Sequence, residues 1–298
     1  MLADLAHPTE PAAGNVSAAK RRGLLVRLTV APILLATVCA LLGWHDRTGN
    51  SATTDVVLLL FAAGAAYEVA GMTAKAGKSA SVPVAVGFSA ALAGLGLLWP
   101  ADPAARGAAR SLLLVGAVVA TFVGQFRLPR PGDLDRLLAT LLPVVYVGYL
   151  LGCLREVGDG PQGAKRLLLV IVAAKASDIG GWVVGKALGR HKMIPSVSPG
   201  KTWEGTAGGL LFSAGAAVAV LAWTGPLPGL ASSSGGAAAL GVVLGAASIL
   251  AGLTQSALKR RAGVKDSSSL LPEMGGVLDM VDSLLLAGPA AWLWSLLA

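Results

Sequence analysis

Apolar residues in this chain come in long runs and not in the strict alternation of a half-buried strand. Runs of about 20 apolar residues, the length that an α-helix needs to cross a bilayer, recur along the whole sequence. The pattern predicts an all-α, polytopic integral membrane protein with about nine transmembrane helices. We expect these helices near residues 23–44, 56–72, 82–99, 108–126, 137–154, 167–188, 206–223, 237–258 and 276–297.

The composition agrees with a membrane protein. Charged residues make up 13% of the chain, against roughly 25% in soluble domains. Because no long polar block separates the apolar runs, we expect a single transmembrane domain over residues 20–298, preceded by a disordered tail over residues 1–19. The formal net charge of +8 by itself would suggest nucleic acid, but the cations flank the apolar runs, so we expect no nucleic-acid partner.

The positions of the cations predict the topology. Most of the 24 Lys and Arg residues fall in segments on the same side as the N-terminus. The positive-inside rule assigns such segments to the cytoplasm, so a cytoplasmic N-terminus in the cell (inner) membrane is predicted. The opposite side is predicted to hold Arg47, Arg106, Arg110, Arg155, Lys165 and Arg166, whereas Lys175 falls within a span.

A polar island interrupts the apolar pattern between residues 256 and 282. Asp279 and Asp282 are three residues apart near the start of the last apolar run, so on a helix they lie about 60° apart and share one face. A charge inside a span costs roughly 3 kcal/mol on insertion scales, and two carboxylates also repel each other. A divalent cation relieves both costs, and oxygen ligands without His or Cys favour Mg²⁺. The alternative is a pair of solvated interfacial aspartates.

Cations and glycines accompany these aspartates. Cations near a bound metal ion and a polyphosphate neutralise charge during phosphoryl transfer, although ordinary positive-inside charge is the alternative explanation. Consecutive glycines allow backbone amides to approach a phosphate closely. The candidates on this island are Lys259, Arg260, Lys265, Gly275 and Gly276, with Asp266 on the same loop.

A second polar island covers residues 175–205. Lys175 and Asp178 are three residues apart and can pair within the sixth predicted span. Ser198, followed by a proline, predicts a helix start with Ser as the N-cap. Free amides at that helix end, with Lys201 nearby, would form an anion site. Glu204 follows as either a helix-start charge or a site residue.

Residues 256–282 resemble the signature of the phosphatidate cytidylyltransferases (CDP-diacylglycerol synthases). That signature contains a Ser, Lys-Arg, Lys-Asp, a Pro, His-Gly-Gly, Asp-Arg and a final Asp. The second island, with SPGKTWEG at residues 198–205, is similar to the family's other characteristic segment. Two positions differ, because Met274 stands for the His and Met280 for the Arg. The matching residues are Ser256, Lys259, Arg260, Lys265, Asp266, Pro272, Gly275, Gly276, Asp279 and Asp282.

The resemblance implies transfer of a cytidylyl group from CTP to phosphatidate, giving CDP-diacylglycerol and pyrophosphate in phospholipid biosynthesis. It implies Mg²⁺ on Asp266, Asp279 and Asp282, with a second cation left open, and a catalytic role for Lys259. The expected partners are CTP, phosphatidate, membrane lipids and a second copy in a homodimer, with the site on the cytoplasmic side. Residues expected to contact substrates are Asp178, Ser198, Lys201, Glu204, Ser256, Arg260, Lys265, Gly275 and Gly276.

Three alternatives stay open at this point. The acceptor could be another membrane lipid phosphate, such as an isoprenoid phosphate. A non-catalytic paralogue that binds phospholipid or assembles partners would fit the changes at Met274 and Met280. An ion-coupled transporter would need charged residues deep in several spans, for which the sequence offers Glu68, Lys175 and Asp178. Consumption of CTP that depends on the aspartates would distinguish the enzyme from the other two classes.

Overall fold

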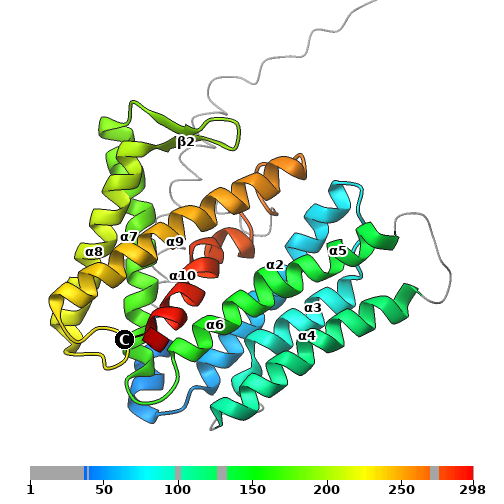
Figure 1. The fold of residues 1–298 in the computed structure, drawn as a ribbon, viewed down its shortest axis with the longest axis horizontal. Helices are drawn as coiled ribbons and strands as arrows, with labels where there is room; N and C mark the ends of the chain where they lie inside the picture. The colour runs from blue at the N-terminus through cyan, green and yellow to red at the C-terminus, as the bar shows by residue number, and fades with distance from the viewer. Residues whose placement is uncertain (1–36, 39, 98–101, 126–132, 269–274, 298) are drawn as a thin grey trace, which may run out of the picture.

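The computed structural model describes residues 37–38, 40–97, 102–125, 133–268 and 275–297. This part of the chain forms a bundle of long helices with one β-hairpin, and Figure 1 shows the hairpin at one end of the bundle above α7 and α8. A helical segment (residues 37–38 and 40–48) precedes α2. The elements are α2 (Ala52–Lys75), α3 (Val82–Ala93), η1 (Leu95–Leu97), α4 (Pro103–Gln125), α5 (Asp133–Pro143), η2 (Val144–Tyr149), α6 (Leu150–Val157), α7 (Gly163–Leu188), β1 (Lys192–Ile194), β2 (Ser198–Thr202), α8 (Trp203–Thr224), α9 (Ser234–Arg261) and α10 (Val277–Leu297).

Within the described residues, 7 helical segments are long and apolar enough to cross a membrane. They are α2, α4, α7, α8, α9, α10 and the continuous stretch Asp133–Val157, which joins α5, η2 and α6. This confirms the all-α, polytopic prediction. The third predicted span, 82–99, is shorter than expected, since α3 has 12 residues and reaches only about 18 Å. Much of the first predicted span, 23–44, lies outside the described residues, so the count of nine and the side of the N-terminus stay predictions.

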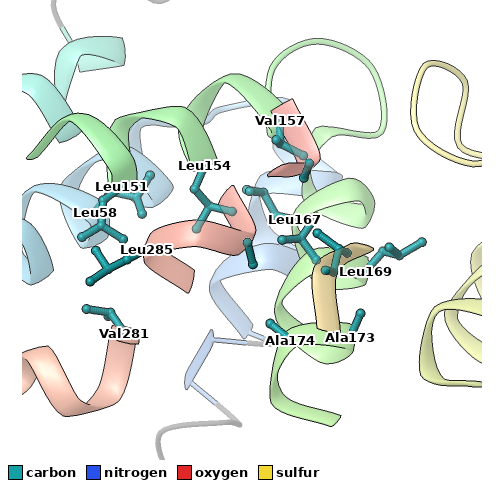
Figure 2. Close-up of a cluster of buried hydrophobic side chains, with 14 of the residues drawn as sticks. Leu58, Leu151, Leu154, Val157, Leu167, Leu169, Ala173, Ala174, Val281 and Leu285 are labelled. Atoms are coloured by element: carbon teal, nitrogen blue, oxygen red, sulfur yellow. The ribbon is translucent and has the colours of Figure 1, made fainter. Parts of the chain in front are cut away.

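The largest core cluster lies where α2, α6, α7 and α10 come together. Figure 2 shows leucines of these helices pointing toward one another, among them Leu58, Leu151, Leu167 and Leu285, none of which is more than 8% exposed. In a bilayer, lipid tails are as apolar as these side chains, so close packing and not transfer from water favours the association of the helices. This core fixes α7 and α10 side by side and thereby positions the acidic residues that both helices carry.

Small residues bring α7, α8 and α9 close together. Ser213 Oγ on α8 donates a hydrogen bond of 2.7 Å to the carbonyl oxygen of Gly241 on α9. Ser248 Oγ on α9 lies 3.3 Å from the carbonyl oxygen of Ala174 on α7. Hydroxyl-to-carbonyl hydrogen bonds of this kind across small-residue interfaces are typical of membrane helix pairs. They hold α9 against the helices that carry the second polar island.

Gly241→Ala tests this close approach. An added Cβ would lie 2.6 Å from Ala214 Cα and 2.7 Å from Ser213 O, both backbone atoms of α8. The helices would have to separate, so we expect a loss of about 1–3 kcal/mol in the free energy of unfolding. The measurement is the thermal unfolding midpoint in detergent. Gly215→Ala on α8 is the matched control, because its Cβ would meet nothing within 4 Å; equal midpoints for the two variants would contradict the packing.

A network of ion pairs joins α2, α4 and α6 at the end of the bundle away from the hairpin. Arg155, 3% exposed, pairs with Asp55, which is fully buried. Arg110 Nη2 lies 2.6 Å from Glu156 Oε1. Arg106, also fully buried, pairs with Asp159. These arginines are among the few cations predicted on the non-cytoplasmic side, and each is neutralised by an acidic partner in the structure.

The β-hairpin corrects one prediction. Ser198 lies in β2 and not at a helix N-terminus, so its expected role as an N-cap is wrong. The helix α8 begins later, at Trp203, where Thr202 Oγ1 accepts a hydrogen bond of 3.1 Å from Gly205 N. The residue before a proline prefers extended backbone, which suits Ser198 before Pro199 in a strand. Thr202 is therefore the N-cap of α8, the role predicted for Ser198.

Candidate active site

The two polar islands, far apart in the sequence, lie at the same end of the bundle. Figure 1 shows the hairpin, the C-terminal end of α9 and the N-terminal end of α10 on this side. Lys201 Nζ, from the hairpin, donates a hydrogen bond of 2.9 Å to the carbonyl oxygen of Ile249 on α9. Lys175 on α7 lies 3.8 Å from Asp282 on α10. Lys175 and Lys201 of the second island thus contact the two helices, α10 and α9, that carry the first.

Asp279 on α10 holds the loop between α9 and α10, described at residues 262–268 and 275–276 and called the signature loop below, against α9. Its Oδ1 accepts hydrogen bonds from Lys259 Nζ at 2.8 Å and from Gln255 Nε2 at 3.0 Å. Its Oδ2 accepts from Ser267 Oγ at 2.8 Å and from Gly276 N at 3.0 Å. Both carboxylate oxygens are thus engaged within the protein. Lys259, predicted to be catalytic, is held by this aspartate with a side chain only 16% exposed.

Gly275 and Gly276 make the contacts of Asp279 possible. Gly275 has φ +84°, in the left-handed region that glycine adopts without strain. A Cβ at this position would overlap the carboxylate of Asp279. The amide of Gly276 donates to Asp279 and so is not free for a phosphate in this conformation. The two glycines therefore allow the chain to turn tightly around the aspartate before α10 begins.

Glu68 on α2 was not among the predicted site residues, but the structure places it at the start of α10. The side chain is buried, with 6% of the residue exposed. Its Oε1 accepts from Ser268 Oγ at 2.6 Å and from Val277 N at 2.8 Å. Its Oε2 accepts from Ser267 Oγ at 2.8 Å and from Leu278 N at 2.9 Å. A carboxylate at the N-terminus of a helix satisfies free amides and interacts favourably with the helix dipole.

One sequence signal pointed to Glu68. An acidic residue in an apolar run needs a partner inside the protein, since an unpaired charge in a span is costly. From the sequence, Glu68 was expected only as a charged residue within a span that a transporter could use. The structure gives it a different role, because its carboxylate holds the start of α10 and the preceding serines. Its partners lie about 200 positions along the chain, so local spacing could not identify them.

Asp282 and Asp178 face a common cation. Lys175 Nζ lies 3.8 Å from Asp282 Oδ1 and 3.8 Å from Asp178 Oδ2. The predicted pairing of Lys175 with Asp178 is confirmed, and Asp282 joins it from the neighbouring helix. Asp282 Oδ1 also accepts a hydrogen bond from Ser283 N, and Ser248 Oγ lies 3.3 Å from Asp178 Oδ1. The sequence predicted that Asp279 and Asp282 act as one pair on a shared helix face. In the structure each has its own set of partners.

The remaining residues of the first island lie near the surface. Ser256 Oγ donates a hydrogen bond of 2.7 Å to the carbonyl oxygen of Gly252 on its own helix. The side chains of Arg260, Lys265 and Asp266 are exposed and make no hydrogen bond or ion pair with other residues in the part of the chain that the structure describes. They are free to contact a ligand from the aqueous side.

In the second island, Glu204 closes the hairpin onto α8. Its Oε1 lies 2.6 Å from His191 Nδ1, and its carboxylate accepts from His191 N at 3.2 Å. Lys201 is half-buried near the acidic cluster. Burial lowers the pKa of Lys201 from its ordinary value, and the negative charges of Asp178 and Asp282 act in the opposite direction. The structure thus places Lys201 close enough to these two carboxylates to interact with them electrostatically.

Carboxylate oxygens are the donors available for a metal ion at this site. Among the described residues, no group of three or more His, Cys, Asp or Glu side chains is gathered closely enough to hold one. The predicted Mg²⁺ ligands Asp266, Asp279 and Asp282 are therefore not brought together in this conformation. Asp282 and Asp178 accept few hydrogen bonds and lie on facing helices, so their oxygen donors fit a hard cation such as Mg²⁺.

Comparison with known proteins gives the family. Three similar curated proteins are the phosphatidate cytidylyltransferases of Haemophilus influenzae, Pseudomonas aeruginosa and Mycobacterium tuberculosis, at 39%, 40% and 34% identity. The matches cover 51%, 53% and 55% of this chain and 52%, 65% and 49% of the relatives, so the chain spans about half to two thirds of their length. The sequence profile described as "Cytidylyltransferase family" matches residues 25–297. Because that match extends over most of the sequence, the chain belongs to the cytidylyltransferase family.

Proposed function

We propose that this protein transfers a cytidylyl group from CTP to phosphatidate, giving CDP-diacylglycerol and pyrophosphate in phospholipid biosynthesis. The observation that carries the proposal is the acidic and basic cluster near the start of α10, where Asp282 lies against Lys175 and, through it, Asp178 in the middle of α7. A lipid phosphate lies at headgroup depth and a nucleotide arrives from water. The end of α9 and the start of α10 are accessible from water, and Lys175 and Asp178 lie deeper along α7, so the site can be reached by both substrates.

In the proposed reaction, an oxygen of the phosphatidate phosphate attacks the α-phosphorus of CTP. The bond from that phosphorus to the bridging oxygen breaks, and pyrophosphate leaves. A phosphate monoester is already anionic at neutral pH, so the attack needs no dedicated general base, which agrees with the Met274 that replaces the family His. Phosphoryl transfer depends mainly on positioning and on neutralising charge. The cations for this role are Lys201, Lys259, Arg260 and Lys265. Ser198 is the proposed hydrogen-bond donor, and Ser256 would become a second one by turning its hydroxyl away from the carbonyl oxygen of Gly252.

We also propose Mg²⁺ as the cofactor; the signature aspartates Asp266, Asp279 and Asp282 would hold it after a rearrangement that brings them together, since they are not gathered in the described structure. When bound, the ion supplies Lewis-acid stabilisation of the phosphate charge. Asp282 has acceptor capacity available, whereas Asp279 would have to exchange some of its present donors. Asp178, beside Asp282, offers a further oxygen.

The proposed orientation places this site on the cytoplasmic side of the inner membrane. The end of α9 carries Lys259, Arg260 and Arg261, and Lys265 follows on the loop. At the opposite end of the bundle, Arg106 and Arg155 are neutralised by acidic partners. The positive-inside rule counts Lys and Arg near the helix ends, so these four cations at the site end support a cytoplasmic location, where CTP is available.

Formation of CDP-diacylglycerol from labelled CTP and phosphatidate tests the function. The purified full chain, in detergent with Mg²⁺, is expected to form the product and to release pyrophosphate in equal amount. Removing Mg²⁺ with a chelator should stop the reaction, and adding the ion back should restore it. If the folded protein consumes no CTP with phosphatidate or with other lipid phosphates, the proposal is wrong.

A further inference from the structure

An apolar cavity of about 360 Å³ adjoins the acidic cluster. Its wall is formed by the helical segment that precedes α2 together with α2, α6, α7 and α10. Figure 2 shows several of its lining residues, including Leu58, Leu151, Leu154 and Val281. Among the described lining residues, Thr54 and Lys175 are the polar ones. The described wall is thus apolar apart from Thr54 and the cation Lys175, which lies next to the carboxylates of the site.

Lys175 is held near two carboxylates without a hydrogen bond to either. The distances from its Nζ to Asp178 and Asp282 are both 3.8 Å, longer than the roughly 2.7–2.9 Å of a charge-assisted hydrogen bond. In the described part of the chain, its Nζ donates no hydrogen bond to another residue, and its side chain is 39% exposed. An ammonium carries three N–H donors. The two acidic neighbours stabilise the charge, while the donors stay available to a ligand.

Met280 lines the same cavity as Lys175. It occupies the position at which the phosphatidate cytidylyltransferase signature has an Arg, immediately after the first aspartate of α10. This chain therefore lacks a cation on α10 at that point. Lys175 brings a cation to the cavity from α7, close to Asp282, which is two residues beyond Met280.

We propose that this cavity receives an acyl chain of the lipid phosphate and that Lys175 binds the phosphate, supplying the positive charge that Met280 does not. The inference deepens the proposed function and rests on it. An acyl chain matches the apolar lining, and an anionic headgroup is the complement of the cation in the wall. With the phosphate on Lys175, the lipid headgroup lies beside Asp282, where the proposed reaction takes place.

Lys175→Met removes the charge and keeps an apolar side chain of similar length. Binding is measured without CTP, as the shift of the thermal unfolding midpoint on titration with phosphatidate or with diacylglycerol of the same chains. We expect wild-type protein to bind phosphatidate more tightly than diacylglycerol. Lys175→Met should weaken phosphatidate binding about tenfold, as for loss of a charge-assisted hydrogen bond, and leave diacylglycerol binding unchanged.

Lys165→Met is the matched control. Lys165 lies on the same helix, has a side chain 35% exposed and faces Asp46 at 4.0 Å, but it stands in the first turn of α7, whereas Lys175 lies in the middle. The same substitution there should leave binding of both lipids as in the wild type. If Lys175→Met binds phosphatidate as tightly as Lys165→Met does, the role of Lys175 is refuted.

Placing a cation on α10 tests whether phosphatidate binding depends on the positive charge itself and not on the lysine at position 175. Met280→Arg in the Lys175→Met background is expected to restore most of the phosphatidate affinity, since residues 280 and 175 line one cavity. If Lys175 had only a structural role, an arginine on another helix could not restore what Lys175→Met removes. The double variant must fold like the wild type for this comparison. If it then binds phosphatidate no better than Lys175→Met does, the idea that Lys175 supplies the charge missing at Met280 is refuted.

Ile171→Trp tests the acyl chain. Ile171 lines the cavity one helical turn before Lys175, and a larger side chain would fill part of the space. We expect weaker binding of long-chain phosphatidate and unchanged binding of a short-chain analogue. An equal effect on both, or no effect on either, would contradict an acyl chain in this cavity.

The outcomes separate this inference from the proposed function. Phosphatidate binding that depends on Lys175, without formation of CDP-diacylglycerol, would support the lipid site and refute the proposed reaction. Formation of CDP-diacylglycerol by Lys175→Met, with an unchanged KM for phosphatidate, would support the reaction and refute the role of Lys175.

Discussion

Asp282→Asn is expected to lower the rate of CDP-diacylglycerol formation at least about a hundredfold, the scale found for removing one electrostatic contribution to a transition state. The carboxylate lies on α10 with its side chain 23% exposed and faces Lys175 across the site. Asparagine keeps the shape but offers no negative charge to a metal ion. Asp178 continues to face Lys175 at 3.8 Å, so the thermal unfolding midpoint should change little.

Asp135→Asn provides the control for this experiment. Asp135 pairs with Lys78 at 2.7 Å, and both side chains are about half exposed. Exposed pairs of this kind contribute about 0–1 kcal/mol, so neither rate nor midpoint should differ from the wild type beyond the error of the assay. A folded Asp282→Asn protein that formed product at the rate of Asp135→Asn would show that the proposed reaction does not use Asp282.

Glu68→Gln is expected to destabilise the protein by about 3 kcal/mol or more, because hydrogen bonds to a charged group contribute about 1.5–3 kcal/mol each. The carboxylate accepts from two hydroxyls and two backbone amides. Glutamine has one oxygen and places an NH₂ donor against groups that are themselves donors. The start of α10 and the serine pair at 267 and 268 would lose their common partner.

Thermal unfolding and limited proteolysis measure this effect. Tyr67→Phe is the neighbouring control, since Tyr67 is 64% exposed and no described residue forms a hydrogen bond with its hydroxyl. We expect the Glu68→Gln protein to unfold at a lower temperature and to lose catalytic activity together with its fold. A midpoint equal to that of Tyr67→Phe would mean that Glu68 does not hold the signature loop.

The spanning helices could be predicted because they depend on local physical chemistry. A run of about 20 apolar residues in a bilayer must satisfy its own backbone hydrogen bonds, and the α-helix does this within the segment. Six of the nine predicted spans therefore correspond to α2, α4, α7, α8, α9 and α10 with shifted ends, and a seventh to Asp133–Val157. The prediction that Ser198 is a helix N-cap was wrong because a Ser before a Pro is compatible with both a helix start and a strand. The pairing of β2 with β1 decided for the strand.

Local spacing also predicted part of the site. Lys175 and Asp178, three residues apart on one helix, form the expected pair. The two aspartates of α10 lie near its start as expected, at positions 279 and 282. What the spacing could not give is the partner of each carboxylate. Asp279 takes its donors from α9 and the signature loop, whereas Asp282 faces α7.

The sequence by itself thus determined the helical spans, the signature residues and the end of the helices at which they gather, because these follow from hydrophobicity and helical periodicity. Only the tertiary structure decided that Glu68 caps α10 and that Lys175 faces Asp282 beside an apolar cavity. Each of these contacts joins helices far apart along the chain. Such partners depend on how the helices pack, and packing is set by the fit of side chains on several helices at once, not by any single segment.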